Sequence, residues 1–148
     1  MPSPCGGTNK PAGGPYGSGG STASSYSFLK RAISSAAGIK GSPLHTPYTA
    51  SKHGVVGMSK ALANELAAVN IRVNTVHPTG VPTGMQPATL HTLLHDKRAD
   101  LGPIFQNALP IVMAEAVDIS NAVLFLISDE ARYVTGLEFK VDAGVTIR

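Results

Sequence analysis

The sequence predicts an α/β fold with a parallel sheet, preceded by a disordered leader. Two observations support this prediction. Residues 1–25 contain seven glycines, four prolines and five serines, which favour coil and supply few side chains for a core. From residue 26 onward, β-rich segments alternate with longer segments of helical periodicity, which is typical of parallel strands joined by helices. At 148 residues the chain has room for one domain, which we place at residues 26–148.

The leader contains glycines at a suggestive spacing. Gly13, Gly17 and Gly19 reproduce a Gly-x-x-x-Gly-x-Gly pattern of the kind that cradles a pyrophosphate. Such a turn should follow a buried strand and open a helix, whereas here Pro11 precedes the pattern and Pro15 interrupts it. We therefore predict a disordered leader over residues 1–25, with no phosphate site in it.

The first two strands are expected on either side of a long helix. Residues 27–34 predict the first strand, although Lys30 and Arg31 are unusual at the centre of a buried parallel strand. Residues 71–77 are rich in Val, Ile and Thr and predict the second strand. Pro78 is expected to end it, because proline cannot continue the hydrogen-bond ladder.

The helix between these strands is expected from about Thr46 to Val69. Residues at helical spacing form one stripe that could cover a sheet, namely Val55, Ser59, Leu62 and Leu66. A helix-linked pair of strands in one sheet is expected to cross over in the right-handed sense.

The remaining segments predict a lid, a helix and a last strand. Residues 86–113 are less regular, with a possible helix from Ala88 to Ala99 and breaks at Gly102-Pro103 and Pro110, and they resemble a substrate lid. A helix is expected over residues 118–128, and its buried side chains are expected to be Ile119, Val123, Phe125, Leu126 and Ile127. Residues 137–142 predict the last strand, and Asp142 at its end is expected to accept hydrogen bonds from neighbouring turns.

Tyr48 and Lys52 suggest acid/base chemistry. Four positions apart on a helix, their side chains lie on one face. A phenol ordinarily titrates at about pH 10, and a nearby ammonium stabilises the phenolate, so such a pair suits proton exchange with hydroxyl or carbonyl substrates. Ser35, at the end of the first strand, could hydrogen-bond the reacting oxygen. Such a Tyr-x-x-x-Lys pair also occurs by chance on amphipathic helices, so the flanking residues decide its meaning.

The flanking residues closely resemble the short-chain dehydrogenase/reductase family. The resemblance covers Ala32 to Lys60, with Ser-Ser-Ala-Ala-Gly and Tyr-x-x-Ser-Lys-His-Gly, then Asn70 to Pro78, and Asp129 to Gly144. The sequences of these motifs are most similar to those of the mycofactocin-coupled, carveol-dehydrogenase-like branch of the family. The resemblance implies a partial doubly wound, Rossmann-like parallel sheet, of which only the second half is present, because a complete member has two βαβαβ halves.

The resemblance also implies roles for single residues. Tyr48 would be the general acid/base, Lys52 its activator and a ribose ligand, and Ser35 the partner of the substrate oxygen. The loop over residues 78–85 would border the nicotinamide of NAD, and NADP is not excluded as the cofactor. The implied cofactor-binding residues are Tyr48, Lys52, Pro78, Thr79, Val81 and Thr83.

The function implied is that of an oxidoreductase that transfers hydride between a nicotinamide dinucleotide and a small alcohol or ketone. The alternative is an inactive truncated fragment or an interaction subunit that cannot bind the cofactor, since the phosphate-binding turn and the asparagine of the family's proton relay are missing. The helix over residues 46–68 is expected to form a homo-oligomer contact, because part of its apolar surface would be uncovered.

Composition and spacing argue against several other functions. The formal charge of +3 is scattered and aromatic residues make up 5% of the chain, so nucleic-acid binding is not expected. No apolar run is long enough to cross a bilayer, so we expect a cytoplasmic protein without a membrane partner. Cys5 is the sole cysteine, which precludes an intrachain disulfide. His91 and His95 lie four apart next to Asp96, but no third ligand supports a metal site.

Overall fold

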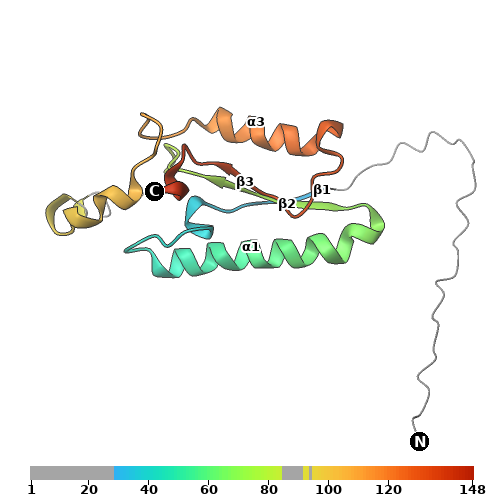
Figure 1. Ribbon diagram of the computed structural model, residues 1–148, viewed down its shortest axis with the longest axis horizontal. Helices are drawn as coiled ribbons and strands as arrows, with labels where there is room; N and C mark the ends of the chain where they lie inside the picture. The colour runs from blue at the N-terminus through green and yellow to red at the C-terminus, as the bar shows by residue number, and fades with distance from the viewer. Residues whose placement is uncertain (1–28, 85–91, 94) are drawn as a thin grey trace, which may run out of the picture.

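A parallel sheet lies between two helices. The computed structural model describes residues 29–84, 92–93 and 95–148. Three strands form one sheet in the order β1-β2-β3, with α1 on one face and α3 on the other (Figure 1). The bounds are β1 Leu29–Ile33, β2 Arg72–Pro78, β3 Glu138–Val141, α1 Thr46–Leu66 and α3 Ala116–Ile127. The predicted α/β fold with a parallel sheet is confirmed. The leader predicted over residues 1–25 lies outside the described residues.

The strands are in register over most of their lengths. β1 pairs with β2 from Leu29 opposite Arg72 to Ile33 opposite Val76, and β2 pairs with β3 up to Pro78 opposite Val141. Because all three run in one direction, their carboxyl ends meet at the same edge of the sheet. β2 extends one residue beyond the predicted end, since Thr79 N donates to Val141 O directly after the proline.

Helix α1 packs on the sheet through a stripe that differs from the predicted one. Val56, Ser59 and Ala63 are buried, while the predicted Val55, Leu62 and Leu66 are half-buried beside them. The buried stripe consists of small or β-branched residues, which lets the helix lie close to the strands. Only Ser59 of the predicted stripe is therefore fully buried.

The main apolar cluster lies on the other face, under α3. Its buried residues are Val76, Ala114, Ile119, Ala122 and Leu126, and five half-buried apolar residues, Phe139 and Val141 of β3 among them, pack against it. The prediction that Phe125 and Ile127 are buried is wrong, because their side chains are 36% and 42% exposed. A helix on the outside of a sheet buries only one stripe of side chains. In the last turn of α3, Leu126 is the side chain in that stripe, so its neighbours Phe125 and Ile127 point away from the core.

The segment predicted as a lid is described only in part. Residues 85–91 and 94 lie outside the described residues. A 3-10 helix, η3, spans Ala99–Phe105 and includes Gly102 and Pro103, which were predicted to break regular structure. Proline is compatible with this helix because its fixed φ is helical and it removes only one donor. Among the helices described, none is both long enough and apolar enough to span a bilayer.

Candidate active site

The predicted catalytic residues lie in segments at the carboxyl edge of the sheet. Ser35 follows β1, and Tyr48 and Lys52 lie in the first two turns of α1. The loop that begins at Thr79 leaves β2 at the same edge. In an open parallel sheet, this edge is where loops gather and ligands bind.

Lys52 lies against the ring of Tyr48. Its Nζ is 5.4 Å from the ring centroid, which is within the range of a cation–π contact. The same ammonium donates to Ile33 O at 3.2 Å, at the end of β1. A lysine ammonium has three N–H groups, so this anchor leaves two of them for other partners. The ammonium thus lies over the Tyr48 ring, which confirms that the two side chains share one face of the helix, as the spacing of four predicted.

The backbone of Lys52 is also tied to the strand end. Ser34 Oγ donates to Lys52 O at 3.2 Å, so one residue of α1 is held to β1 through both its ammonium and its carbonyl. Ser34 is buried. These two contacts fix the second turn of α1 relative to the residue that precedes Ser35.

Ser35 has its hydroxyl at the start of a short 3-10 helix. This helix, η1, spans Ala36–Gly38, and Ser35 Oγ accepts from Ala37 N at 3.1 Å. A serine hydroxyl that accepts one hydrogen bond still has its own proton to donate. Ser35 is half-buried at the carboxyl edge of the sheet.

Behind Ser35 lies a buried histidine that the sequence analysis did not select as a candidate. His77 Nδ1 is 2.8 Å from Ser35 O, and its Nε2 is 2.8 Å from Thr75 Oγ1. Burial lowers the pKa of His77, and the hydrogen bond to Ser35 offsets this only in part. The lowered pKa favours the neutral form of the His77 imidazole.

The last residue of β2 and the loop after it contain the four predicted cofactor contacts that lie outside α1. Pro78 and Thr79 are half-buried, and Thr79 Oγ1 donates to Asn107 Oδ1 at 2.7 Å. Val81 packs against the apolar cluster, whereas Thr83 is exposed. The loop is therefore held from inside by Thr79 and Val81, and it presents Thr83 to solvent.

Three further residues shape this edge of the molecule without a signal in the sequence. Lys40 Nζ donates to Ile104 O at 2.7 Å and to Val145 O at 2.5 Å, joining the loop after η1 to η3 and to the C-terminal residues. Burial lowers the pKa of Lys40, and the Asp142 charge opposes this.

The other two residues are His45 and Asn107. The His45 ring lies edge-on to Tyr48 and to Phe105, with centroids 6.2 and 6.4 Å away. Asn107 Nδ2 donates to Ile111 O and Val112 O, at 2.9 and 3.1 Å. The contact between His45 and Phe105 joins residues 60 positions apart, so spacing alone could not predict it, whereas the other contacts of His45 and Asn107 join residues three to five positions apart.

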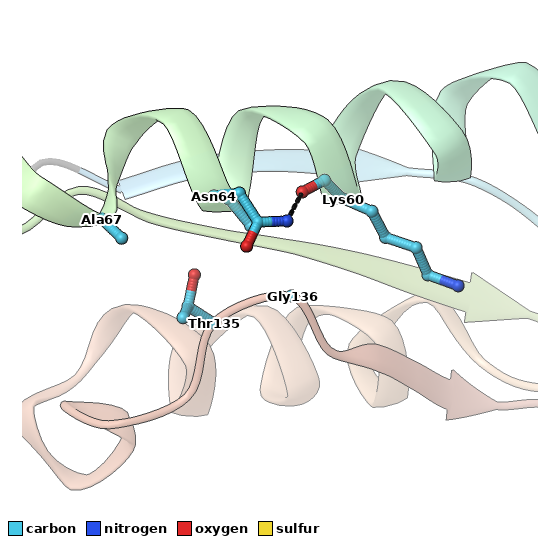
Figure 2. A pocket seen from close by; sticks show the side chains of 6 residues that line it. Lys60, Asn64, Ala67, Thr135 and Gly136 are labelled. Atoms are coloured by element: carbon cyan, nitrogen blue, oxygen red, sulfur yellow. Dashed lines mark hydrogen bonds between the residues drawn. The ribbon is translucent and has the colours of Figure 1, made fainter. Parts of the chain in front are cut away.

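A groove of about 320 Å³ lies elsewhere, between α1 and the loop that leads into β3 (Figure 2). Its lining is Lys60, Ala63, Asn64, Ala67, Thr135 and Gly136. Lys60 is eight residues beyond Lys52, or about 12 Å along the helix. The lining of the groove includes none of the predicted site residues. We therefore place the candidate active site at the carboxyl edge of the sheet, where the predicted acid/base side chains lie.

The histidine pair that the sequence analysis rejected as a metal site is only partly described. His91 lies outside the described residues, and His95 Nδ1 is 2.9 Å from Asp96 Oδ1 at the surface. Within the described ranges, no group of three or more His, Cys, Asp or Glu side chains is arranged to hold a metal ion.

Comparison with known proteins adds to this geometry. A family model described as enoyl-(acyl carrier protein) reductase matches residues 31–146. The chain is 46% identical over 123 residues to (-)-trans-carveol dehydrogenase from Rhodococcus erythropolis, a match covering 78% of this chain and 44% of the relative. The chain thus spans a little under half the length of this relative, and the same holds for the other curated relatives compared.

Comparison with solved structures also finds similarity to dehydrogenases. A short-chain dehydrogenase from Mycobacterium paratuberculosis bound to NAD is 39% identical with a TM-score of 0.75, covering 81% of this chain and 45% of that one. Carveol dehydrogenase from Mycobacterium avium in complex with NAD is 40% identical with a TM-score of 0.72, covering 81% and 46%.

Proposed function

Because the chain belongs to the short-chain dehydrogenase/reductase family, we propose that it is the carboxyl-terminal half of an oxidoreductase that interconverts a small alcohol and a ketone with NAD. The observation that carries the proposal is the Lys52 ammonium beside the Tyr48 ring, anchored to the end of β1 next to Ser35. The family resemblance suggests the chemistry, and Tyr48, Lys52 and Ser35 are the side chains that this chemistry requires.

The proposed proton transfers use the side chains of Tyr48, Lys52 and Ser35. In the direction of alcohol oxidation, the Tyr48 phenolate takes the hydroxyl proton of the substrate, and in reduction the Tyr48 phenol returns a proton to the alkoxide. Lys52 stabilises the phenolate by its charge. The Ser35 hydroxyl donates to the substrate oxygen and stabilises the negative charge that develops there.

The residues present fit one end of the cofactor. Lys52 keeps two N–H groups for ribose hydroxyls after its bond to Ile33 O, and the loop from Pro78 to Thr83 lies at the same edge of the sheet. When bound, NAD supplies the hydride acceptor. We propose that Thr83 and the Val81 backbone lie beside its nicotinamide, with Pro78 and Thr79 shaping the loop.

The first experiment tests Tyr48 and Lys52 with trans-carveol as the probe alcohol and NAD as the oxidant. Tyr48→Phe should lower kcat by at least about 10²-fold, the size of a general acid/base contribution. Lys52→Met should lower kcat and also weaken NADH binding. The matched controls are Tyr133→Phe, at a tyrosine that is 88% exposed, and Lys60→Met on the same helix as Lys52. If Tyr48→Phe and Tyr133→Phe retained equal activity, the proposal would be wrong.

The alternative is a noncatalytic relative that keeps the fold. The observation in its favour is that the chain aligns with only 44% of its carveol dehydrogenase relative. Titration of the chain with NADH, followed by nicotinamide fluorescence, separates the two functions. Saturable binding supports the oxidoreductase, and no saturable signal at millimolar NADH supports the noncatalytic alternative.

A further inference from the structure

His77 is a buried titratable group for which the proposed reaction gives no role. It lies near the carboxyl end of β2, and its side chain is fully buried, with 0% exposure. Thr75 and His77 are two residues apart on one strand, so they share the face of the sheet that α1 covers. Both ring nitrogens have partners at 2.8 Å, one of which is the backbone of Ser35.

The partners decide where the ring proton is. Ser35 O is a carbonyl and can only accept, so His77 Nδ1 must carry the proton that joins them. Nε2 faces the Thr75 hydroxyl, whose one proton has two acceptors in reach, Nε2 at 2.8 Å and Leu137 O at 3.4 Å, and the shorter contact favours donation to Nε2. The contacts therefore select the neutral tautomer with its proton on Nδ1.

Ser35 lies just beyond the end of the paired strands. The last ladder pair of β1 and β2 is Ile33 opposite Val76, and Ser34 N makes the final backbone bond, to Val76 O at 2.8 Å. Beyond that point the Ser35 carbonyl accepts from Gly38 N at 2.9 Å, a bond inside its own turn. The bond from His77 therefore connects Ser35 to the sheet after the ladder has ended.

We propose that His77 is a positioning residue that holds the Ser35 carbonyl and thereby sets where the Ser35 hydroxyl points. The backbone of Ser35 is fixed by His77 on one side, and its hydroxyl oxygen is fixed by Ala37 N on the other. A rotation of this peptide would move the hydroxyl away from the substrate oxygen. The inference rests on the proposed role of Ser35 in alcohol oxidation.

The test is a double-mutant cycle between His77→Leu and Ser35→Ala, with kcat measured on trans-carveol and NADH binding measured in parallel. A shift of about 1 Å in a positioned group costs about 10²-fold in rate, so His77→Leu should lower kcat by about 10-fold or more while NADH affinity is unchanged. In the Ser35→Ala background the same change should have no further effect, because the hydroxyl that His77 positions is already absent.

Rescue by His77→Asn distinguishes positioning from packing. An Asn side-chain amide can donate from nearly the same place as Nδ1, whereas the amide of His77→Gln reaches toward the Nε2 position. His77→Asn should restore most of the rate and His77→Gln should not. Equal losses from His77→Leu in both backgrounds would show that the histidine supports the fold alone and would overturn the proposal.

A second measurement is independent of activity. Nitrogen-15 NMR of the histidine ring should show His77 neutral at pH 7 with its proton on Nδ1 and a coupling across the hydrogen bond to Ser35. A proton on Nε2 would overturn the proposal even in a chain without activity. A chain that is inactive but shows the Nδ1 proton would instead contradict the proposed function and leave the contact between His77 and Ser35 established.

Discussion

Gly38 lies where the chain leaving β1 passes close to α1. A Cβ atom at this position would meet Ser34 Oγ and would lie 3.0 Å from Lys52 O. These two atoms form the hydrogen bond that holds α1 to the strand end. The absence of a side chain at Gly38 therefore permits the contact that positions Lys52.

Gly38→Ala is expected to lower the free energy of unfolding by about 1–3 kcal/mol, as overpacking of a tight contact does. It should also lower kcat, because the displaced Lys52 backbone moves the ammonium away from the Tyr48 ring. Urea unfolding and the carveol assay measure the two effects. Gly41→Ala is the control in the same loop, since nothing lies within 4 Å of a Cβ there. Equal stability of the two variants would contradict the expected clash.

Single residues of the site were predictable only where a local rule applied. The spacing of four between Tyr48 and Lys52 implied one helix face, and the structure has the ammonium 5.4 Å from the ring centroid. The expectation that Asp142 accepts hydrogen bonds from nearby turns is also confirmed. The contact of Lys40 with Ile104, 64 residues away, depends on how whole segments pack, and no spacing rule reaches that far.

At the scale of one element, the turn after β3 is organised by Asp142. Its carboxylate accepts from Gly144 N at 2.9 Å, from Thr146 N at 3.1 Å and from Thr146 Oγ1 at 2.5 Å. Burial alone would raise the pKa of Asp142, but these hydrogen bonds and the Lys140 charge outweigh burial, so the pKa is lowered. The charged form is therefore the one that stabilises the turn.

A lowered carboxylate pKa means that this stabilisation is fully present above the unfolded-state pKa of about 4 and is lost as the pH falls through the folded-state value. Asp142→Asn should lower the unfolding free energy by about 1.5–3 kcal/mol at pH 7, the range for hydrogen bonds to a charged group, and by less at pH 3. Urea titrations at both values measure the difference. The control is Asp129→Asn, at an exposed aspartate, and a deficit independent of pH would contradict the assignment.

The elements themselves were predicted more accurately than their buried faces. α1 and α3 begin and end within about three residues of the predicted bounds, because helical periodicity and strand composition are local signals. Which side of α3 faces the sheet depends on the angle at which the helix packs. For that reason Phe125 and Ile127 were wrongly placed in the core.

At the scale of the whole molecule, the outward face of α1 is open. Gly54, Gly57, Met58 and Ala61 recur at helical spacing and are exposed, and no atom lies within 4 Å of a Cβ built on either glycine. Small residues on a helix face let a second helix approach closely. We propose that this face pairs with the same face of a second copy.

The prediction is that the chain sediments as a dimer and that Ala61→Arg shifts it to a monomer. Arginine is a good helix former, so the change should block contact without unfolding α1. Ser120→Arg, at an exposed position on α3, is the matched control and should leave the dimer intact. A parent chain that sediments as a monomer at every concentration tested would rule out association through α1.

The two faces of the sheet differ in what they contain. The apolar cluster of Val76, Ile119 and Leu126 lies on the α3 side, whereas His77 and the strand ends that anchor Lys52 lie toward α1. The side chains proposed for the chemistry and the main apolar cluster therefore lie on different faces of the sheet, although Val81 of the loop after β2 packs against that cluster. Such a separation lets relatives diverge in what they convert while inheriting one common means of folding.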